Sequence, residues 1–213
     1  MKKHKKKGMI KTILLNHVQN YARDYGILLI LFIIGVIIGI VFINNTATEQ
    51  KNEINTYINT FVDTLKEGQN INYGNLLKES LIQNLMLAVV LWFSGTAIML
   101  LPIIYGIVLF RGFCLGYTIS SIIAILGNNQ GIIFALLGLL LQNIFFIPAL
   151  LALSGSGIRL YKTIAKDRKI NNIKTEICKH TLFCIIILTL LIMASFIEVY
   201  ISSNLLINYV KWM

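Results

Sequence analysis

The amino-acid sequence predicts an all-α fold, a polytopic transmembrane helix bundle of five spans with the N-terminus inside the cell, the C-terminus outside and an external amphipathic helix. Composition predicts the class, since 56% of the 213 residues are hydrophobic and only 13% are charged, where a soluble domain has about 25% charged residues. The hydrophobic residues form continuous runs of about 18 or more, the length that crosses a bilayer as a helix. Transmembrane β-strands show short alternating segments instead.

The distribution of positive charge predicts the orientation of the spans. The formal net charge is +10. Seven Lys or Arg residues precede the first hydrophobic run, and seven more lie between Arg159 and Lys179, both ends included. Because cytoplasmic segments of membrane proteins carry an excess of Lys and Arg, both blocks are expected inside. Their position beside hydrophobic runs indicates contact with membrane lipids, and we expect no nucleic acid as a partner.

The first span is predicted over residues 26–43, after a basic cytoplasmic segment over residues 1–25. This run is longer than the hydrophobic region of a typical signal peptide, and no clear small-residue cleavage site is present, so the span is expected to remain uncleaved. Residues 45–79 come next and carry three Lys against five acidic residues. Their low positive charge places this loop outside.

The external loop is expected to contain an amphipathic helix. Thr46 and Glu49 form a capping-box pattern, and Gly68 is a suitable stop. Between them an apolar stripe recurs at helical spacing and consists of Ile54, Tyr57, Ile58, Phe61, Val62 and Leu65. The stripe has two interpretations. Either it packs on the membrane surface or on the external ends of the spans, or it docks an extracytoplasmic partner.

Three further spans fit between the external loop and the second basic block. Ser80 to Leu153 is a stretch of 74 residues, and one crossing needs about 20. Pro102 and the GNNQG of residues 127–131 mark the turns. The predicted spans are 81–101, 104–126 and 131–153, followed by a basic cytoplasmic loop over 154–180 and a fifth span over 181–203.

A search for catalytic motifs is negative. The three histidines, His4, His17 and His180, lie in predicted cytoplasmic flanks without a nearby carboxylate pair or nucleophile. The sequence contains no P-loop, no H-E-x-x-H and no G-x-S-x-G. Its three cysteines form no C-x-x-C pair. We therefore expect a protein that is not an enzyme, with no catalytic residues, no cofactor and no metal site.

Small and polar residues inside the spans point to helix packing. Gly35 and Gly39 form a G-x-x-x-G motif in span one, and Gly112 and Gly116 form another in span three, a spacing that permits close helix approach.

In span four, Gln142 and Asn143 precede Pro148, which is expected to kink the helix by freeing the Ile144 carbonyl. These amides have two interpretations, an interhelical hydrogen bond that holds the kinked span, or a substrate site.

Arg111 is the only charged residue between Glu79 and Arg159. In one interpretation its long side chain reaches back to the cytoplasmic interface and anchors the inner end of span three. In the other it turns into the bundle beside the Gly112 and Gly116 face, where a neighbouring helix accepts its hydrogen bonds. Glu198 is a poor partner for it, because the predicted topology puts that carboxylate near the opposite interface.

Two segments of the chain resemble a known family. They are FRGFCLGY at residues 110–117 and LLLQNIFFIPALLALSGSGIRL at residues 139–160. With the lysine-rich start, the early span and the size of the external loop, they resemble stage II sporulation protein M, an integral membrane family of endospore-forming bacteria.

The resemblance implies a membrane scaffold in forespore engulfment. Its expected partners are sporulation proteins D and P, two peptidoglycan-degrading enzymes, held together at the septal or engulfing mother-cell membrane. The remaining alternative is a permease or channel-like component that uses spans three and four.

Overall fold

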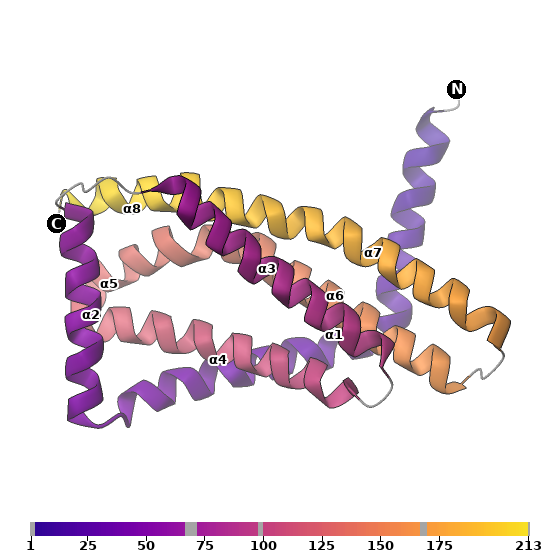
Figure 1. Ribbon diagram of the computed structural model, residues 1–213, viewed down its shortest axis with the longest axis horizontal. Helices are drawn as coiled ribbons and strands as arrows, with labels where there is room; N and C mark the ends of the chain where they lie inside the picture. The colour runs from indigo at the N-terminus through magenta and orange to yellow at the C-terminus, as the bar shows by residue number, and fades with distance from the viewer. Residues whose placement is uncertain (1–2, 67–71, 98–99, 167–169, 213) are drawn as a thin grey trace.

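The computed structural model describes residues 3–66, 72–97, 100–166 and 170–212, and these residues form helices joined by short turns (Figure 1). The α-helices are α1 (Lys3–Asn44), α2 (Thr48–Lys66), α3 (Tyr73–Thr96), α4 (Leu101–Leu126), α5 (Asn128–Ala135), α6 (Leu141–Lys166), α7 (Ile170–Phe196) and α8 (Ser203–Val210). Two π-helical segments, η2 (Leu136–Leu140) and η3 (Ile197–Ser202), join α5 to α6 and α7 to α8 into continuous rods.

Five segments of the described chain are long and apolar enough to cross a membrane, which confirms the five-span bundle. They are Ala22–Asn44, Tyr73–Thr96, Leu101–Leu126, Asn128–Ala165 and Ile173–Val210. The last two contain 38 residues each, about 57 Å of helix, and are longer than the hydrocarbon core of a bilayer. The side of the membrane on which each end lies is still the prediction from charge.

The boundaries between spans follow local chemistry. The Asn72 side chain accepts a hydrogen bond from the Asn75 backbone at 3.1 Å and caps α3, so this span starts before the predicted residue 81. Pro102 lies in the first turn of α4, where its missing N–H costs nothing. Gly127 separates α4 from α5 with φ of +82°, a conformation that glycine adopts without strain.

Most of the described residues within the predicted basic segment over 154–180 are helical. α6 continues to Lys166 and α7 begins at Ile170. Within this segment Gly157 of α6 packs closely against Gly95 of α3. A Cβ on Gly95 would lie 2.7 Å from the Gly157 Cα. The small residues of this segment therefore form a helix contact, not a turn.

The start of α2 also differs from the expected capping box. α2 begins at Thr48, and the Thr46 hydroxyl donates to the Phe42 carbonyl at the end of α1 (2.8 Å). The hydroxyl therefore satisfies a carbonyl at the C-terminus of one helix rather than an amide at the N-terminus of the next. Gly68, the expected stop, lies outside the described residues.

Helix α2 runs crosswise at one end of the bundle, with α8 and the α4–α5 turn beside it (Figure 1). The N-terminal part of α1 and the end of the α6–α7 hairpin lie toward the other end. One hydrophobic cluster fills the centre of the bundle between α1, α3, α4, α6 and α7. A second lies beneath α2, between α4, α5 and α8. The long spans thus hold α2 in a fixed position across their ends.

Candidate functional site: a cavity beneath the amphipathic helix

A cavity of about 1010 Å³ lies between α2 and the end of the bundle that α2 crosses. Five parts of the chain line it: α2, the first turns of α3, the last turns of α4, the α5–η2 segment and the η3–α8 segment. This volume is in the range of sites that hold small molecules. Apolar side chains make up much of its wall, and a few polar groups converge on one part of it.

Glu198 is the polar centre of the cavity wall. Its Oε2 accepts two hydrogen bonds, one from the Ser80 hydroxyl of α3 at 2.6 Å and one from the Gln142 amide of α6 at 2.7 Å. Side chains from three helical segments, α3, α6 and η3, therefore meet at one carboxylate. The hydrogen bonds described for this side chain all fall on Oε2, so Oε1 is left to accept from another group.

Both π-helical segments contribute to this arrangement. Glu198 and Ser202 belong to η3, and Gln142 is the second residue of α6, which follows η2. A π-turn inserts a residue into the helix and rotates the side chains around it, which is why such segments often occur at functional sites. Ser202 is 2% exposed and lines the cavity, and its hydroxyl has no hydrogen-bond partner among the described residues.

The amphipathic stripe of α2 divides into a buried part and an exposed part. Ile58, Val62 and Leu65 are buried against α4, α5 and α8, and Ile54 packs at the edge of the same cluster. Tyr57 is 76% exposed and Phe61 is 44% exposed. The stripe therefore packs on the bundle through three residues and leaves two aromatic rings at the rim of the cavity.

The four glycines singled out in spans one and three lie in one interface between α1 and α4. A Cβ on Gly35 would lie 2.2 Å from the Leu109 carbonyl oxygen, and one on Gly112 would lie 2.2 Å from that of Phe32. Gly39 and Gly116 face the opposite backbone in the same way. Both G-x-x-x-G motifs thus bring two helix backbones into direct contact, and neither lines the cavity.

Arg111 stacks on a neighbouring helix. Its guanidinium carbon lies 5.2 Å from the ring centre of Phe146 on α6, a cation–π geometry. Phe146 is 8% exposed and belongs to the central hydrophobic cluster. The guanidinium of Arg111 thus lies over an aromatic ring of the central cluster on a neighbouring helix.

The polar residues of span four have separate partners. Asn143 donates its amide to the Leu139 carbonyl of η2 at 2.8 Å, not to the Ile144 carbonyl that Pro148 leaves free. Gln142 makes an interhelical bond, to Glu198. Pro148 lies inside α6 on an exposed face. Gln142 thus holds the Glu198 carboxylate in the cavity wall, while Asn143 donates a hydrogen bond to a backbone carbonyl of η2.

The sequence analysis missed several polar pairs between helices. His180 is 4% exposed, and its Nδ1 lies 2.7 Å from the Ser156 hydroxyl, which corrects the expectation of a flank residue without a nearby nucleophile. The pair is buried inside the bundle and links α6 to α7. Trp92 of α3 donates to Thr181 of α7 at 3.0 Å. The only signal in the sequence was a polar residue within a mostly apolar helix.

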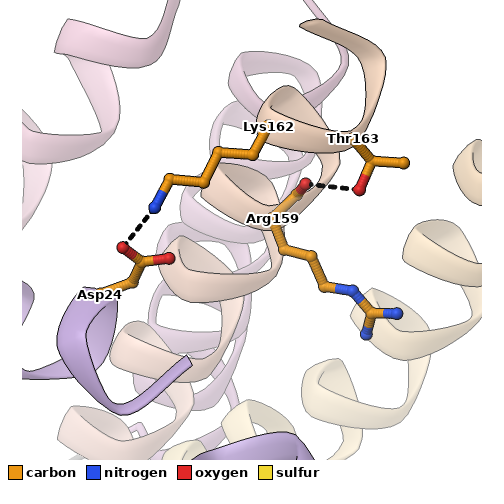
Figure 2. A network of polar contacts seen from close by, with 4 residues as sticks. All are labelled: Asp24, Arg159, Lys162 and Thr163. Carbon is orange, nitrogen blue, oxygen red and sulfur yellow. Dashed lines mark hydrogen bonds and ion pairs between the residues drawn. The ribbon is translucent and has the colours of Figure 1, made fainter. Parts of the chain in front are cut away.

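A salt bridge joins α1 to α6 at the end of the bundle opposite α2. Figure 2 shows Lys162 reaching Asp24, with 2.5 Å between Nζ and Oδ1. The Asp24 side chain is 9% exposed. Thr163 donates to the Arg159 carbonyl at 3.0 Å, and the Arg159 side chain extends away from the Asp24 pair. This contact fixes the start of the first span, in α1, against the end of the fourth, in α6.

Comparison with known proteins identifies the family. Residues 28–203 match the family described as Stage II sporulation protein M. The match includes both segments on which the resemblance rested, residues 110–117 and 139–160. Comparisons with curated proteins and with solved structures find no match. The chain therefore belongs to the stage II sporulation protein M family and is a sporulation-related, multi-pass membrane protein.

Proposed function

We propose that this protein is a membrane scaffold of engulfment, which holds peptidoglycan-degrading enzymes at the septal and engulfing mother-cell membrane. The observation that carries the proposal is the exposed aromatic edge of α2. Tyr57 is 76% exposed on a helix that the bundle fixes across its end. Exposed aromatic residues on a rigid support are the groups that most often anchor a protein partner.

The way in which α2 is held supports docking rather than simple packing. Three stripe residues, Ile58, Val62 and Leu65, already bury their side chains against the bundle. The ring of Tyr57 is not needed for that contact and remains available, while Phe61 meets Phe134 of α5 edge to face and is still 44% exposed. Because α2 lies on the predicted external side, its partners would be the extracytoplasmic domains of sporulation proteins D and P, the enzymes that the family resemblance names.

The test is recovery of these two enzymes from sporulating cells. Tyr57→Glu places an unpaired charge where an apolar contact is proposed, which is unfavourable enough to weaken docking. We expect normal amounts of the variant in the membrane but reduced co-purification of sporulation proteins D and P. Asn59→Glu is the matched control, since Asn59 is exposed on another side of the same helix and should leave recovery unchanged.

A buried position separates docking from packing. Ile58→Glu puts a carboxylate into the cluster beneath α2, so we expect the amount of folded protein to fall along with partner recovery. Full recovery of both enzymes with Tyr57→Glu would contradict docking at this edge. Equal loss with Asn59→Glu would assign the effect to added charge instead.

The cavity supports a second function, transport as a permease or channel-like component. Its specific observation is a partly buried carboxylate, Glu198, in the wall of a cavity inside a membrane protein, because ionisable groups at such positions often mark solute pathways. Liposomes that contain the purified protein provide the test. Solute flux that Glu198→Gln abolishes supports transport, while partner recovery without flux supports the scaffold.

A further inference from the structure

The side chains that line the cavity beneath α2 have an unusual balance of charge. Three glutamates line it, Glu53 of α2, Glu79 of α3 and Glu198 of η3. Among the described residues that line it, none is Lys or Arg, although the whole chain carries a net charge of +10. A cavity of this kind attracts cations and repels anions.

Aromatic rings add a second preference for cations. Tyr57, Phe61, Tyr117 and Phe134 all line the cavity, and the rings of Phe61 and Phe134 meet edge to face with 6.3 Å between their centres. The faces of aromatic rings attract ammonium groups, and rings combined with carboxylates are a common way to bind them. The recognition chemistry is therefore that of an organic ammonium group rather than of a metal ion.

Unsatisfied polar atoms mark where the ammonium group would bind. Glu198 uses Oε2 for its bonds to Ser80 and Gln142, which leaves Oε1 as an acceptor. One helical turn later, Ser202 is 2% exposed and its hydroxyl has no partner among the described residues. A buried hydroxyl without a partner is costly, and a ligand that bonds to it removes that cost.

The rest of the cavity fits an apolar tail. Leu76 of α3, Ile122 of α4 and Leu206 of α8 are among the apolar side chains that line it. Its wall includes the first turns of α3 and the last turns of α4, and these two helices diverge toward α2 (Figure 1). A lipid bound here would lay its acyl chain along the apolar side chains of these helix ends.

We propose that this cavity is a binding site for a membrane lipid whose headgroup carries a free ammonium group. The ammonium group lies against Glu198 and Ser202, the aromatic rings surround it, and the acyl chain packs along the apolar wall between α3 and α4. The lipid contact rests on Glu198, Ser202 and the inner wall of the cavity, and it shares the rings of Tyr57 and Phe61 with the edge of α2 proposed for docking.

The test measures lipid affinity by native mass spectrometry on the full-length protein in detergent. The probes are lysyl-phosphatidylglycerol, which has a net positive headgroup, and phosphatidylglycerol with the same acyl chains. We expect Glu198→Gln to weaken binding of lysyl-phosphatidylglycerol about tenfold, the effect of losing one charged hydrogen bond. We expect no change in the affinity for phosphatidylglycerol, because an anionic headgroup without an ammonium group gains nothing from the Glu198 carboxylate.

Two further variants keep the test decisive. Glu49→Gln is the matched control, because Glu49 is exposed on α2 and does not line the cavity, and it should bind both lipids as the wild type does. Where Glu198→Gln fails to fold, the exposed pair Glu53→Gln and Glu79→Gln replaces it, with about threefold weaker binding of lysyl-phosphatidylglycerol expected. Unchanged affinity for that lipid in the cavity variants, or an equal loss for phosphatidylglycerol, overturns the proposal.

Discussion

At the scale of single residues, several polar side chains inside the bundle are held by partners on other helices. Asn84 of α3 donates to the Ser195 hydroxyl of α7 at 2.8 Å, and Gln142 of α6 donates to Glu198 of η3. Water is scarce inside a membrane bundle, so each of these groups needs a protein partner. The chemistry of each residue therefore predicts that a partner exists.

Arg111 provides a prediction at this scale. Arg111→Lys keeps the positive charge but loses the planar group that stacks on Phe146. We expect a loss of about 0.5–2 kcal/mol in the free energy of unfolding, measured on the purified protein in mixed micelles. A double-mutant cycle with Phe146→Leu should show that most of this loss depends on the ring.

The two interpretations of Arg111 give different results in this cycle. An arginine that only anchors the span at the interface is replaced by lysine at little cost, because lysine also reaches the interface. A coupling energy near zero between Arg111 and Phe146 would therefore support the anchor. Engulfment assays on the same two variants would then report whether the stacking matters to the cell.

The sequence indicates which polar residues within the spans need a partner, but it does not indicate which residues those partners are. Arg111 and Glu198 stand out as charges within or at the end of apolar runs. Their partners, Phe146 and Ser80, come from other helices at sequence distances of 35 and 118 residues. Pairing over such distances depends on how the packed helices are oriented about their axes, and no local sequence pattern indicates that orientation.

At the scale of elements, the contact between α1 and α4 depends on the absence of side chains. Gly35, Gly39, Gly112 and Gly116 let the two backbones touch, and in lipid such close approach is a main source of helix association. The spacing of each motif could be recognised from the sequence. That the two motifs pack against each other could not, because each would equally fit a second copy of the chain.

A pair of glycines in α4 tests this contact. Gly112→Ala would bring a Cβ within 2.2 Å of the Phe32 carbonyl oxygen, so the helices must separate, at a cost of about 1–3 kcal/mol in the free energy of unfolding. Gly106→Ala is the control on the same helix, since a Cβ there meets nothing within 4 Å. It should be neutral or stabilising by up to about 1 kcal/mol. Equal unfolding energies for the two variants would contradict the glycine contact.

The π-helical segments could not be predicted from the sequence. η2 and η3 lie within apolar runs whose composition fits an ordinary α-helix. A π-turn arises where packing favours one inserted residue, here beside the bonds that converge on Glu198. The sequence pattern therefore predicts both rods as helices, and the rotation that brings Glu198 and Ser202 to the cavity comes from tertiary packing.

At the scale of the whole molecule, the two ends of the bundle differ in charge. The segments predicted outside carry four Lys against five acidic residues, and those predicted inside carry fourteen Lys or Arg against three acidic residues. The acidic cavity and α2 lie at one end, and the Asp24–Lys162 pair lies at the other. Five spans and this asymmetry together predict that α2 and the C-terminus lie on the external side.

Cysteine labelling tests this orientation on intact cells. In a background without Cys114, Cys178 and Cys184, Asn59→Cys on α2 and Thr175→Cys at the start of α7 each provide one exposed thiol. We expect a membrane-impermeant maleimide to label Asn59→Cys directly and to label Thr175→Cys only after the cells are permeabilised. The opposite pattern would invert the bundle and put the α2 edge in the cytoplasm, away from any peptidoglycan enzyme. Labelling of both thiols on intact cells would contradict an odd number of spans between them. Either result would contradict the scaffold proposal, because it requires α2 outside the cell and α7 to begin inside it.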